Sequence, residues 1–379
     1  MQSVIIKPMG GRCNFACVYC YDFTLTDEER VPEPEKDIMS EATLTNALTR
    51  ITKYANDLGD IIAFNWHGEE PLRAGLDFFI SVQDKTDFLR SKGAKLKHYL
   101  QTNGSLLTEE LVEFFVAHNF KLGFSLDGIG EINDATRKYP DGSGTFEDIM
   151  RGIRLYKSLA GVAGVITVVT KQNINHIEEL YDFCKSEGIG LKLNPIECSG
   201  RAVSIWQNLA ITPLEYARIV LKIYNKWLHD QDSDCMSSES VIEDTVFSIL
   251  SGEPVGCVSQ VSCQDSLISL THKGEVYPCS RFDDNPNFLL GNVNDVEDFS
   301  MIAESPLRQY LRERAARVKG CLPSCNIYST CNSGCMHQAY THYGTIDAKD
   351  PFCLAYSLIQ KTIKESVDSL LTKAIIAEG

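Results

Sequence analysis

Three cysteines near the start of the chain have a spacing that can hold a reactive metal centre. They lie in the run Cys13-Asn-Phe-Ala-Cys17-Val-Tyr-Cys20, directly after a short apolar segment. A closed structural zinc site would need a fourth protein ligand nearby. An iron–sulfur cubane held by only three cysteines instead keeps one iron free to bind a small molecule. The spacing therefore favours an iron–sulfur cluster that takes part in chemistry.

A second group of cysteines lies in the C-terminal part of the chain. It holds eight of the 14 cysteines, which are Cys257, Cys263, Cys279, Cys321, Cys325, Cys331, Cys335 and Cys353. In a large chain without a secretion signal, clustered cysteines bind metal more often than they form disulfides. Eight thiolates suffice for two four-cysteine sites. Their spacing alone leaves zinc and iron–sulfur clusters open, because closely spaced cysteine pairs are also typical of zinc sites.

The elements that must position the first cysteines alternate between strands and helices. Apolar runs predict buried strands at 4–6, 61–66, 96–100, 121–126, 162–169 and 190–193. Helical patterns between them predict helices at 41–56, 76–89, 109–118, 146–159 and 177–187, with Ser40 as an N-cap. This alternation predicts an α/β fold with a parallel sheet, either an open sheet or a partial barrel.

Each predicted strand is followed by a polar or glycine-rich run. These runs are 13–20, 67–71, 101–104, 125–128, 170–173 and 194–198. Because barrel enzymes build their active site at the C-terminal ends of the strands, the pattern predicts a site on one rim of a partial barrel. Beyond about residue 200 the alternation stops. Helices are expected at 213–229, up to about residue 250 and at 353–377, and a hairpin at 267–270 and 275–277.

The first motif resembles the signature of radical S-adenosylmethionine (radical SAM) enzymes, in which an aromatic residue, here Tyr19, precedes the third cysteine. The resemblance implies a partial (β/α)6 barrel in which Cys13, Cys17 and Cys20 hold a [4Fe–4S] cluster that chelates S-adenosylmethionine. It also implies a set of residues that contact this cofactor. They are Tyr19, Gly68, Glu69, Glu70, Pro71, Gln101, Asn103, Ser125, Asp127 and Arg137.

Some of these positions have a second interpretation. The family's GGEP-like loop reads Gly68-Glu69-Glu70-Pro71, so Glu69 replaces a glycine and either points away from the cofactor or alters its contacts. Ser125 and Asp127 would bind the ribose hydroxyls, or Asp127 would belong to an ordinary Asp-Gly turn. Arg137 would bind the cofactor or form a surface salt bridge.

The second group of cysteines resembles the SPASM domain. One spacing departs from the family, since three residues separate Cys321 from Cys325 where two are usual. The resemblance assigns Cys257, Cys263, Cys279 and Cys335 to a first auxiliary [4Fe–4S] cluster. It assigns Cys321, Cys325, Cys331 and Cys353 to a second, which makes three clusters in all. The predicted domains are the radical SAM barrel at 1–229, a helical linker at 230–255 and the SPASM domain at 256–379.

SPASM relatives act mostly on peptides. We therefore predict a maturase that cleaves S-adenosylmethionine, abstracts hydrogen from a ribosomally made peptide and forms a thioether, C–C or C–O cross-link, with an auxiliary cluster taking the second electron. The resemblance leaves open a formylglycine-forming sulfatase maturase, a peptide epimerase, an alcohol dehydrogenase and a non-catalytic electron carrier. Sulfatase maturases carry an aspartate base directly after the hairpin cysteine, where this chain has Ser280. Candidate catalytic residues are Glu197, Asp22 and Tyr21.

Composition limits the partners. The net charge of −15 argues against nucleic acid, because phosphate binding calls for a basic surface. No run of 18 apolar residues predicts a membrane span, and the N-terminus lacks the features of a signal peptide, so we expect a cytoplasmic protein. The expected partners are a peptide, with or without a leader, and an external electron donor such as flavodoxin or ferredoxin. Only twelve residues precede Cys13, so we expect no leader-recognition domain at that end.

Overall fold

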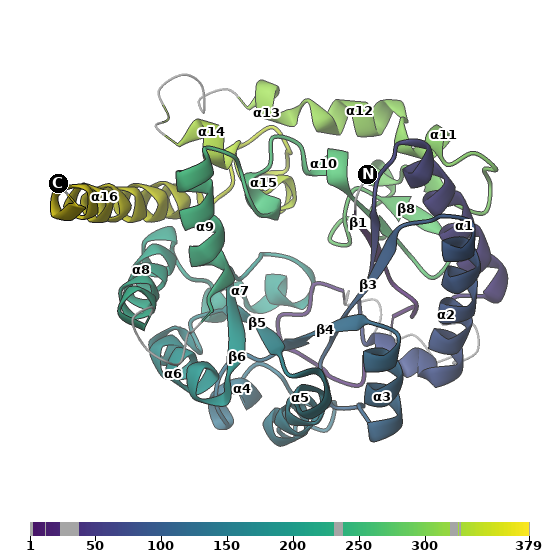
Figure 1. Ribbon diagram of the computed structural model, residues 1–379, viewed down its shortest axis with the longest axis horizontal. Helices are drawn as coiled ribbons and strands as arrows, with labels where there is room; N and C mark the ends of the chain where they lie inside the picture. Colours follow the sequence, from purple (N-terminus) through teal and green to yellow (C-terminus); the bar gives the residue numbers. More distant parts are fainter. Residues whose placement is uncertain are drawn as a thin grey trace.

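The computed structural model describes residues 3–11, 13–22, 38–230, 238–318, 325 and 327–378. Six parallel strands form the first part of one sheet, and helices lie along its outer face (Figure 1). The strands are β1 (Ser3–Ile6), β2 (Ile62–Trp66), β3 (Leu96–Thr102), β4 (Phe120–Ser125), β5 (Ala163–Val169) and β6 (Ile189–Pro195). The predicted α/β partial barrel is confirmed, and each predicted strand lies within a few residues of an observed one.

The helices that cover the barrel follow the strands in sequence. They are α1 (Glu41–Asp57), α2 (Gly75–Ser91), α3 (Glu109–Ala117), α4 (Glu131–Asp134), α5 (Phe146–Ala160), α6 (Ile177–Glu187), α7 (Trp206–Leu209) and α8 (Pro213–Asp230). Ser40 caps α1 as predicted, since its hydroxyl accepts a hydrogen bond from the Thr43 amide at 3.2 Å. At the C-terminal end of α6, Gly188 adopts the left-handed conformation that ends a helix. The core lies between strands and helices and includes Phe64 and Trp66.

The predicted hairpin extends the barrel sheet rather than standing apart from it. Strand β7 (Leu267–Leu270) pairs in parallel with β1, so that Ser3 lies opposite Leu267. Strands β8 (Glu275–Tyr277) and β9 (Gly291–Asn292) then follow in antiparallel pairs, and the whole sheet has the order β6-β5-β4-β3-β2-β1-β7-β8-β9. This pairing sets the segment after β8, including Cys279, beside the loop that carries the first cysteines.

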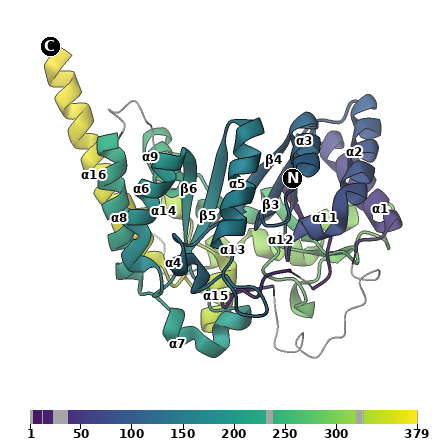
Figure 2. The same cartoon turned by 90° about the horizontal axis from the view of Figure 1, so that it is seen from below.

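The C-terminal part adds short helices and one long one. They are α9 (Ser240–Ser251), α10 (Cys263–Ser266), α11 (Ser300–Ala303), α12 (Pro306–Arg312), α13 (Arg314–Arg317), α14 (Tyr328–Cys331), α15 (Met336–Tyr343) and α16 (Cys353–Glu378). Helix α16 packs against α8 and α9, and its C-terminal end projects from the body of the protein (Figure 2). The proposed division into domains at residues 229 and 256 stays a prediction.

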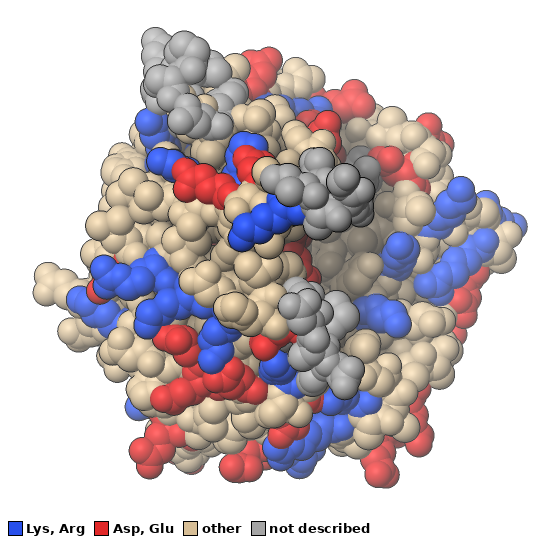
Figure 3. Space-filling model, turned by 60° about the vertical axis from the view of Figure 1, so that its left-hand side comes forward, with Lys and Arg blue, Asp and Glu red and all other residues tan. Residues whose placement is uncertain are grey.

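Charges of both signs lie on the surface. Over the face shown in Figure 3, Lys and Arg side chains alternate with Asp and Glu side chains. Within the described part of the chain, none of the helices combines the length and apolar character needed to cross a bilayer.

Candidate active site

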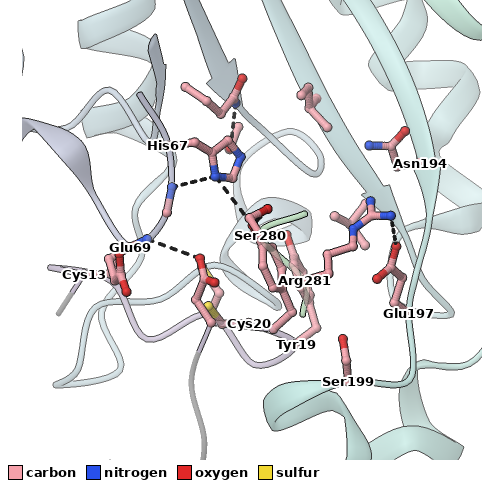
Figure 4. Close-up of a pocket in the computed structure, with 18 of the residues that line it drawn as sticks. Cys13, Tyr19, Cys20, His67, Glu69, Asn194, Glu197, Ser199, Ser280 and Arg281 are labelled. Atoms are coloured by element: carbon pink, nitrogen blue, oxygen red, sulfur yellow. Dashed lines mark hydrogen bonds and ion pairs between the residues drawn. The ribbon is translucent and has the colours of Figure 1, made fainter. Parts of the chain in front are cut away.

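A cavity of about 350 Å³ lies at the C-terminal ends of the barrel strands, and it is closed on one side by the segment that follows β8 (Figure 4). This volume is within the range of small-molecule sites. The barrel loops supply part of the wall, including all three N-terminal cysteines. The C-terminal part supplies Cys257, Cys279, Ser280 and Arg281. Five of the six predicted polar loops therefore contribute to the wall of one cavity, whereas the loop at 170–173 supplies no lining residue.

The loop of Cys13, Cys17 and Cys20 is fixed to the segment that follows β4. The amide of Ala16 donates to the Lys138 carbonyl at 2.7 Å, and the amide of Val18 donates to the Thr136 carbonyl at 2.9 Å. Burial raises the pKa of all three thiols. Thiolates in such a place need a cationic partner. Three cysteines that face one cavity fit a cluster that leaves a position open to a small molecule.

The first auxiliary cysteines (Cys257, Cys263, Cys279 and Cys335) lie together. All four line a second, smaller cavity behind the wall of the first, and Cys257 and Cys279 border both cavities. In the described ranges, no three His, Cys, Asp or Glu side chains are arranged around a point that would hold a single metal ion. Four thiols around a shared cavity are the donor set of a four-cysteine iron–sulfur cluster.

The second auxiliary set is only partly visible. Cys331 is buried, and burial is the main cause that raises the pKa of its thiol to about 12. The negative charges of Cys353 and Cys325 also contribute to this rise. These three cysteines are therefore neighbours. Cys321, the fourth predicted ligand, lies outside the described residues, so its assignment stays a prediction.

Seven of the ten predicted cofactor residues line the main cavity. They are Tyr19, Gly68, Glu69, Gln101, Asn103, Ser125 and Arg137. The remaining three, Glu70, Pro71 and Asp127, lie behind the wall. The Glu70 carboxylate is fully buried and accepts hydrogen bonds from the Thr102 hydroxyl at 2.6 Å and the Asn103 amide at 2.8 Å. Its side chain ties the loop after β2 to the end of β3.

Asp127 also acts from behind the cavity. Its carboxylate accepts hydrogen bonds from the Tyr19 hydroxyl at 2.5 Å, the Thr136 hydroxyl at 2.9 Å and the Val168 amide at 3.0 Å. It also lies 3.1 Å from Nε of Arg137, which is itself buried. Both carboxylate oxygens are thus engaged by the protein. Arg137, for which the sequence left open a cofactor contact or a surface salt bridge, lines the cavity and forms a buried ion pair. Asp127 positions two residues that do face the cavity.

The cavity and its cysteines can be compared with known proteins. A sequence profile of the Radical SAM superfamily matches residues 8–184, and a profile of the SPASM iron–sulfur cluster-binding domain matches residues 262–332. The chain belongs to the radical SAM superfamily and carries a SPASM domain. The signature that led to this interpretation, Cys13 to Cys20, lies within the first match.

The relatives of this radical SAM protein include anaerobic sulfatase-maturating enzymes. It is 26% identical over 339 residues to the cysteine-type anaerobic sulfatase-maturating enzyme of Clostridium perfringens (strain 13 / Type A), with 88% of each chain covered. It is 25% identical over 351 residues to the serine-type enzyme of Bacteroides thetaiotaomicron, covering 88% of this chain and 82% of that one. These matches extend over both the barrel and the SPASM domain.

Solved structures share the fold. Native anSMEcpe with bound AdoMet has a TM-score of 0.85 at 24% identity, covering 98% of this chain and 99% of that one. Streptococcus suis SuiB bound to S-adenosylmethionine has a TM-score of 0.65 at 16% identity, covering 93% and 76% of the two chains. The chain therefore shares its overall fold with these two solved structures.

Glu69 is a departure from the family loop, and its side chain lines the cavity. Its backbone has φ of 40°, a left-handed conformation that glycine adopts more readily. One carboxylate oxygen accepts a hydrogen bond from the Gly11 amide at 3.1 Å, and the other is shielded from solvent and has no hydrogen-bond partner among the described residues. Burial raises the pKa of Glu69 to about 8. Of the two interpretations of Glu69, the geometry favours a role at the cavity.

A buried lysine that the sequence analysis missed organises the wall beside Glu69. Lys7 forms ion pairs with Asp22 and, at 2.8 Å, with Asp283, and its ammonium group donates to the Ser280 carbonyl at 3.3 Å. Burial alone would lower the pKa of Lys7, but the two carboxylates hold it above its usual value. Asp22 is therefore already paired. The only local sequence signal is a charged residue at the end of an apolar strand.

Tyr21 and Glu197, the other two predicted catalytic residues, both face the cavity. The Tyr21 hydroxyl lies 3.3 Å from the Ser280 hydroxyl and 3.5 Å from Nδ1 of His67, and burial raises the pKa of Tyr21 so that it keeps its proton. Glu197 is paired with Arg281 at 2.8 Å and with His337 at 3.2 Å. Burial alone would raise the pKa of Glu197, but these two partners hold it below its usual value, which makes it a weak base.

Proposed function

We propose that this protein is a peptide maturase that closes a cross-link, of the thioether, C–C or C–O kind, in a ribosomally made peptide. The observation that carries the proposal is the wall at Cys279 and Ser280. Two of the first auxiliary cysteines, Cys257 and Cys279, border the cavity there, and a serine stands where the sulfatase maturases that this chain resembles have an aspartate base. A peptide substrate is supported by the solved complexes of anSMEcpe with bound AdoMet and the Cp18Cys or Kp18Cys peptide.

The cysteine sets and the cavity match the demands of this reaction. When bound, the first cluster and S-adenosylmethionine supply a 5′-deoxyadenosyl radical, which takes one hydrogen atom from the peptide. Closing the cross-link then requires the peptide to lose one more electron and one more proton. Cys257 and Cys279 border this cavity and share the smaller one with Cys263 and Cys335, so a cluster held by these four cysteines would lie close enough to take the electron.

The chain must also supply an acceptor for the proton. Asp22 and Glu197 are held in ion pairs, and Tyr21 keeps its own proton, so we assign these three residues to orienting the substrate. Glu69 is better suited, because one of its carboxylate oxygens has no hydrogen-bond partner within the described part of the chain and its pKa of about 8 lies near physiological pH. A general base works best when its pKa is close to the working pH. We therefore assign the proton to Glu69.

The first test is chemical. Protein reconstituted anaerobically with iron and sulfide, reduced with dithionite and given S-adenosylmethionine should contain about twelve irons and release 5′-deoxyadenosine. The variant Cys13→Ala/Cys17→Ala/Cys20→Ala should keep about eight irons and release none. Zinc in place of iron, or iron without cofactor cleavage, would contradict the assignment and favour a structural or electron-carrier role.

The second test concerns the product. The protein is co-expressed with each short peptide encoded beside its gene, and the peptides are analysed by mass spectrometry. A cross-linked product has lost two hydrogen atoms, and its protease fragments stay joined. Formylglycine formation is the second candidate, because the sulfatase-maturating relatives match 88% of this chain. Formylglycine formation would instead place an aldehyde on a sulfatase-type peptide, and a hydrazide probe would capture that aldehyde.

A further inference from the structure

Arg281 connects the main cavity to the first auxiliary cysteines. It follows Cys279 by two residues, and its side chain extends along the cavity wall to Glu197, just beyond the end of β6 (Figure 4). One guanidinium nitrogen, Nη1, lies 2.8 Å from the Glu197 carboxylate and donates a hydrogen bond to Sγ of Cys335 at 3.6 Å. A single positive group thus touches both a carboxylate of the cavity and a predicted cluster ligand.

The partners of Arg281 hold it in place. The second oxygen of Glu197 bonds to Nδ1 of His337 at 3.2 Å, so the carboxylate is fixed from the SPASM side as well. Among the described residues, Arg314 is the other arginine that lines the smaller cavity. Its guanidinium donates to backbone carbonyls, including that of Gly334 at 2.8 Å. Of these two arginines, Arg281 is the one that also faces the main cavity.

This placement has an electrostatic consequence. One-electron reduction of a cluster held by four cysteines adds one negative charge to an already anionic group. A hydrogen bond donated to a ligating sulfur and a nearby positive charge both favour the reduced form and raise the reduction potential. Glu197 partly neutralises Arg281 and so limits the effect. The potential should respond in opposite directions to the loss of either partner.

We propose that Arg281 raises the reduction potential of the first auxiliary cluster, so that this cluster accepts the electron that the peptide loses. The inference rests on the proposed function. In the step concerned, the peptide radical is oxidised by one electron, the cluster is reduced by one electron, and the proton goes to the Glu69 carboxylate. Arg281 is a positioning residue in this scheme, because it acts through the cluster and not on the substrate.

The test is a redox titration of the reconstituted holoenzyme followed by electron paramagnetic resonance. We expect Arg281→Gln to lower the potential of the first auxiliary cluster by at least 59 mV, which is tenfold in the one-electron equilibrium constant. Glu197→Gln should raise it, and Arg281→Lys, which keeps the charge, should leave it closer to that of the parent. The other two clusters serve as internal references.

A purely structural role for Arg281 predicts a different pattern. In that case both Arg281→Gln and Glu197→Gln would lose iron or shift the potential in the same direction, and that result would overturn the proposal. An unchanged potential in Arg281→Gln with full iron content would also overturn it. If Arg281→Gln fails to assemble the cluster, the reduction potential of the Glu197→Gln variant becomes the test. The absence of an upward shift in that variant would then overturn the proposal.

The potentials are measured without any peptide, so they do not depend on the proposed cross-linking. Once the peptide is known, Arg281→Gln should still release 5′-deoxyadenosine but should form at least tenfold less product for each molecule released. Shifted potentials without any peptide product would overturn the proposed function and leave the electrostatic role of Arg281 standing. Unshifted potentials together with full formation of the peptide product would overturn the electrostatic role of Arg281 and leave the proposed function standing.

Discussion

Replacing Asp127 by asparagine tests whether this carboxylate supports the cofactor site from behind or contacts the cofactor itself. Asp127 is fully buried, and Arg137 beside it is 9% exposed. The same carboxylate holds the Tyr19 hydroxyl. Asparagine keeps the shape of the side chain but removes its charge. The guanidinium of Arg137 then remains buried without a counter-charge.

The size of the effect follows from this burial. Removing one partner of a buried ion pair costs about 3–5 kcal/mol. Because the asparagine oxygen can still accept hydrogen bonds, we expect the lower value. At about 2–4 °C per kcal/mol for a domain of this size, the melting temperature should fall by roughly 6–12 °C. A direct charged contact to the ribose would instead be worth about 1.5–3 kcal/mol of binding, or roughly 10- to 150-fold in affinity.

Two measurements separate these cases. Circular dichroism of anaerobically prepared protein gives the melting temperature, and equilibrium dialysis with labelled S-adenosylmethionine gives the affinity. Arg137→Gln should destabilise the fold to a similar degree. The double variant should lose less than the sum of the two single losses, because no buried charge is left unpaired. A melting temperature within about 2 °C of the parent, together with tenfold weaker cofactor binding, would refute this reasoning.

Three further changes test other parts of the structure. Glu69→Gly restores the family residue and removes the proposed proton acceptor. 5′-Deoxyadenosine should still form, while the yield of modified peptide should fall about a hundredfold. A yield of modified peptide equal to that of the parent would exclude Glu69 as the proton acceptor. Burial lowers the pKa of His67 to about 4. The contribution of His67 to stability is therefore complete above pH 6.5 and is lost as the pH falls through 4. His67→Gln should flatten that part of a plot of melting temperature against pH. Gly152→Ala would place a Cβ 2.1 Å from the Gly104 carbonyl and cost about 1–3 kcal/mol in thermal denaturation, whereas the roomier Gly164→Ala should cost less.

The barrel elements were predictable because their signals are local. Each buried strand is an apolar run bounded by polar or glycine-rich residues, and the hairpin strands Leu267–Leu270 and Glu275–Tyr277 match the prediction residue for residue. The parallel pairing of β7 with β1 could not be predicted. Its partners lie more than 250 residues apart, and alternation along a strand does not specify which neighbour it takes.

The same limit explains which site residues were missed. The three N-terminal cysteines are close in sequence, so their spacing alone indicates a shared centre. The ion pair between Lys7 and Asp283 exists only because β1 and β7 are neighbours. Asp127 was placed correctly at the end of β4, but its side chain points into the protein, toward Arg137. The direction of a side chain just beyond a strand depends on packing that no motif encodes.

The departures from the family pattern act together on the charge across the cavity. On the SPASM side, neutral Ser280 stands at the position where the sequence pattern of sulfatase maturases has an aspartate, and the neighbouring Arg281 is positive. On the barrel side, one carboxylate oxygen of Glu69 has no hydrogen-bond partner among the residues that the structure describes, and the raised pKa of this carboxyl group suits it to hold a proton. An oxidation in which the peptide loses an electron and a proton separately gains from such an arrangement, because the electron leaves toward the cationic wall and the proton toward the acidic one. The double variant Ser280→Asp/Glu69→Gly moves the carboxylate from the barrel side to the SPASM side and should restore the charge pattern of a sulfatase maturase. The appearance of a hydrazide-reactive aldehyde on a sulfatase-type peptide would show that the distribution of charge across the cavity selects the product.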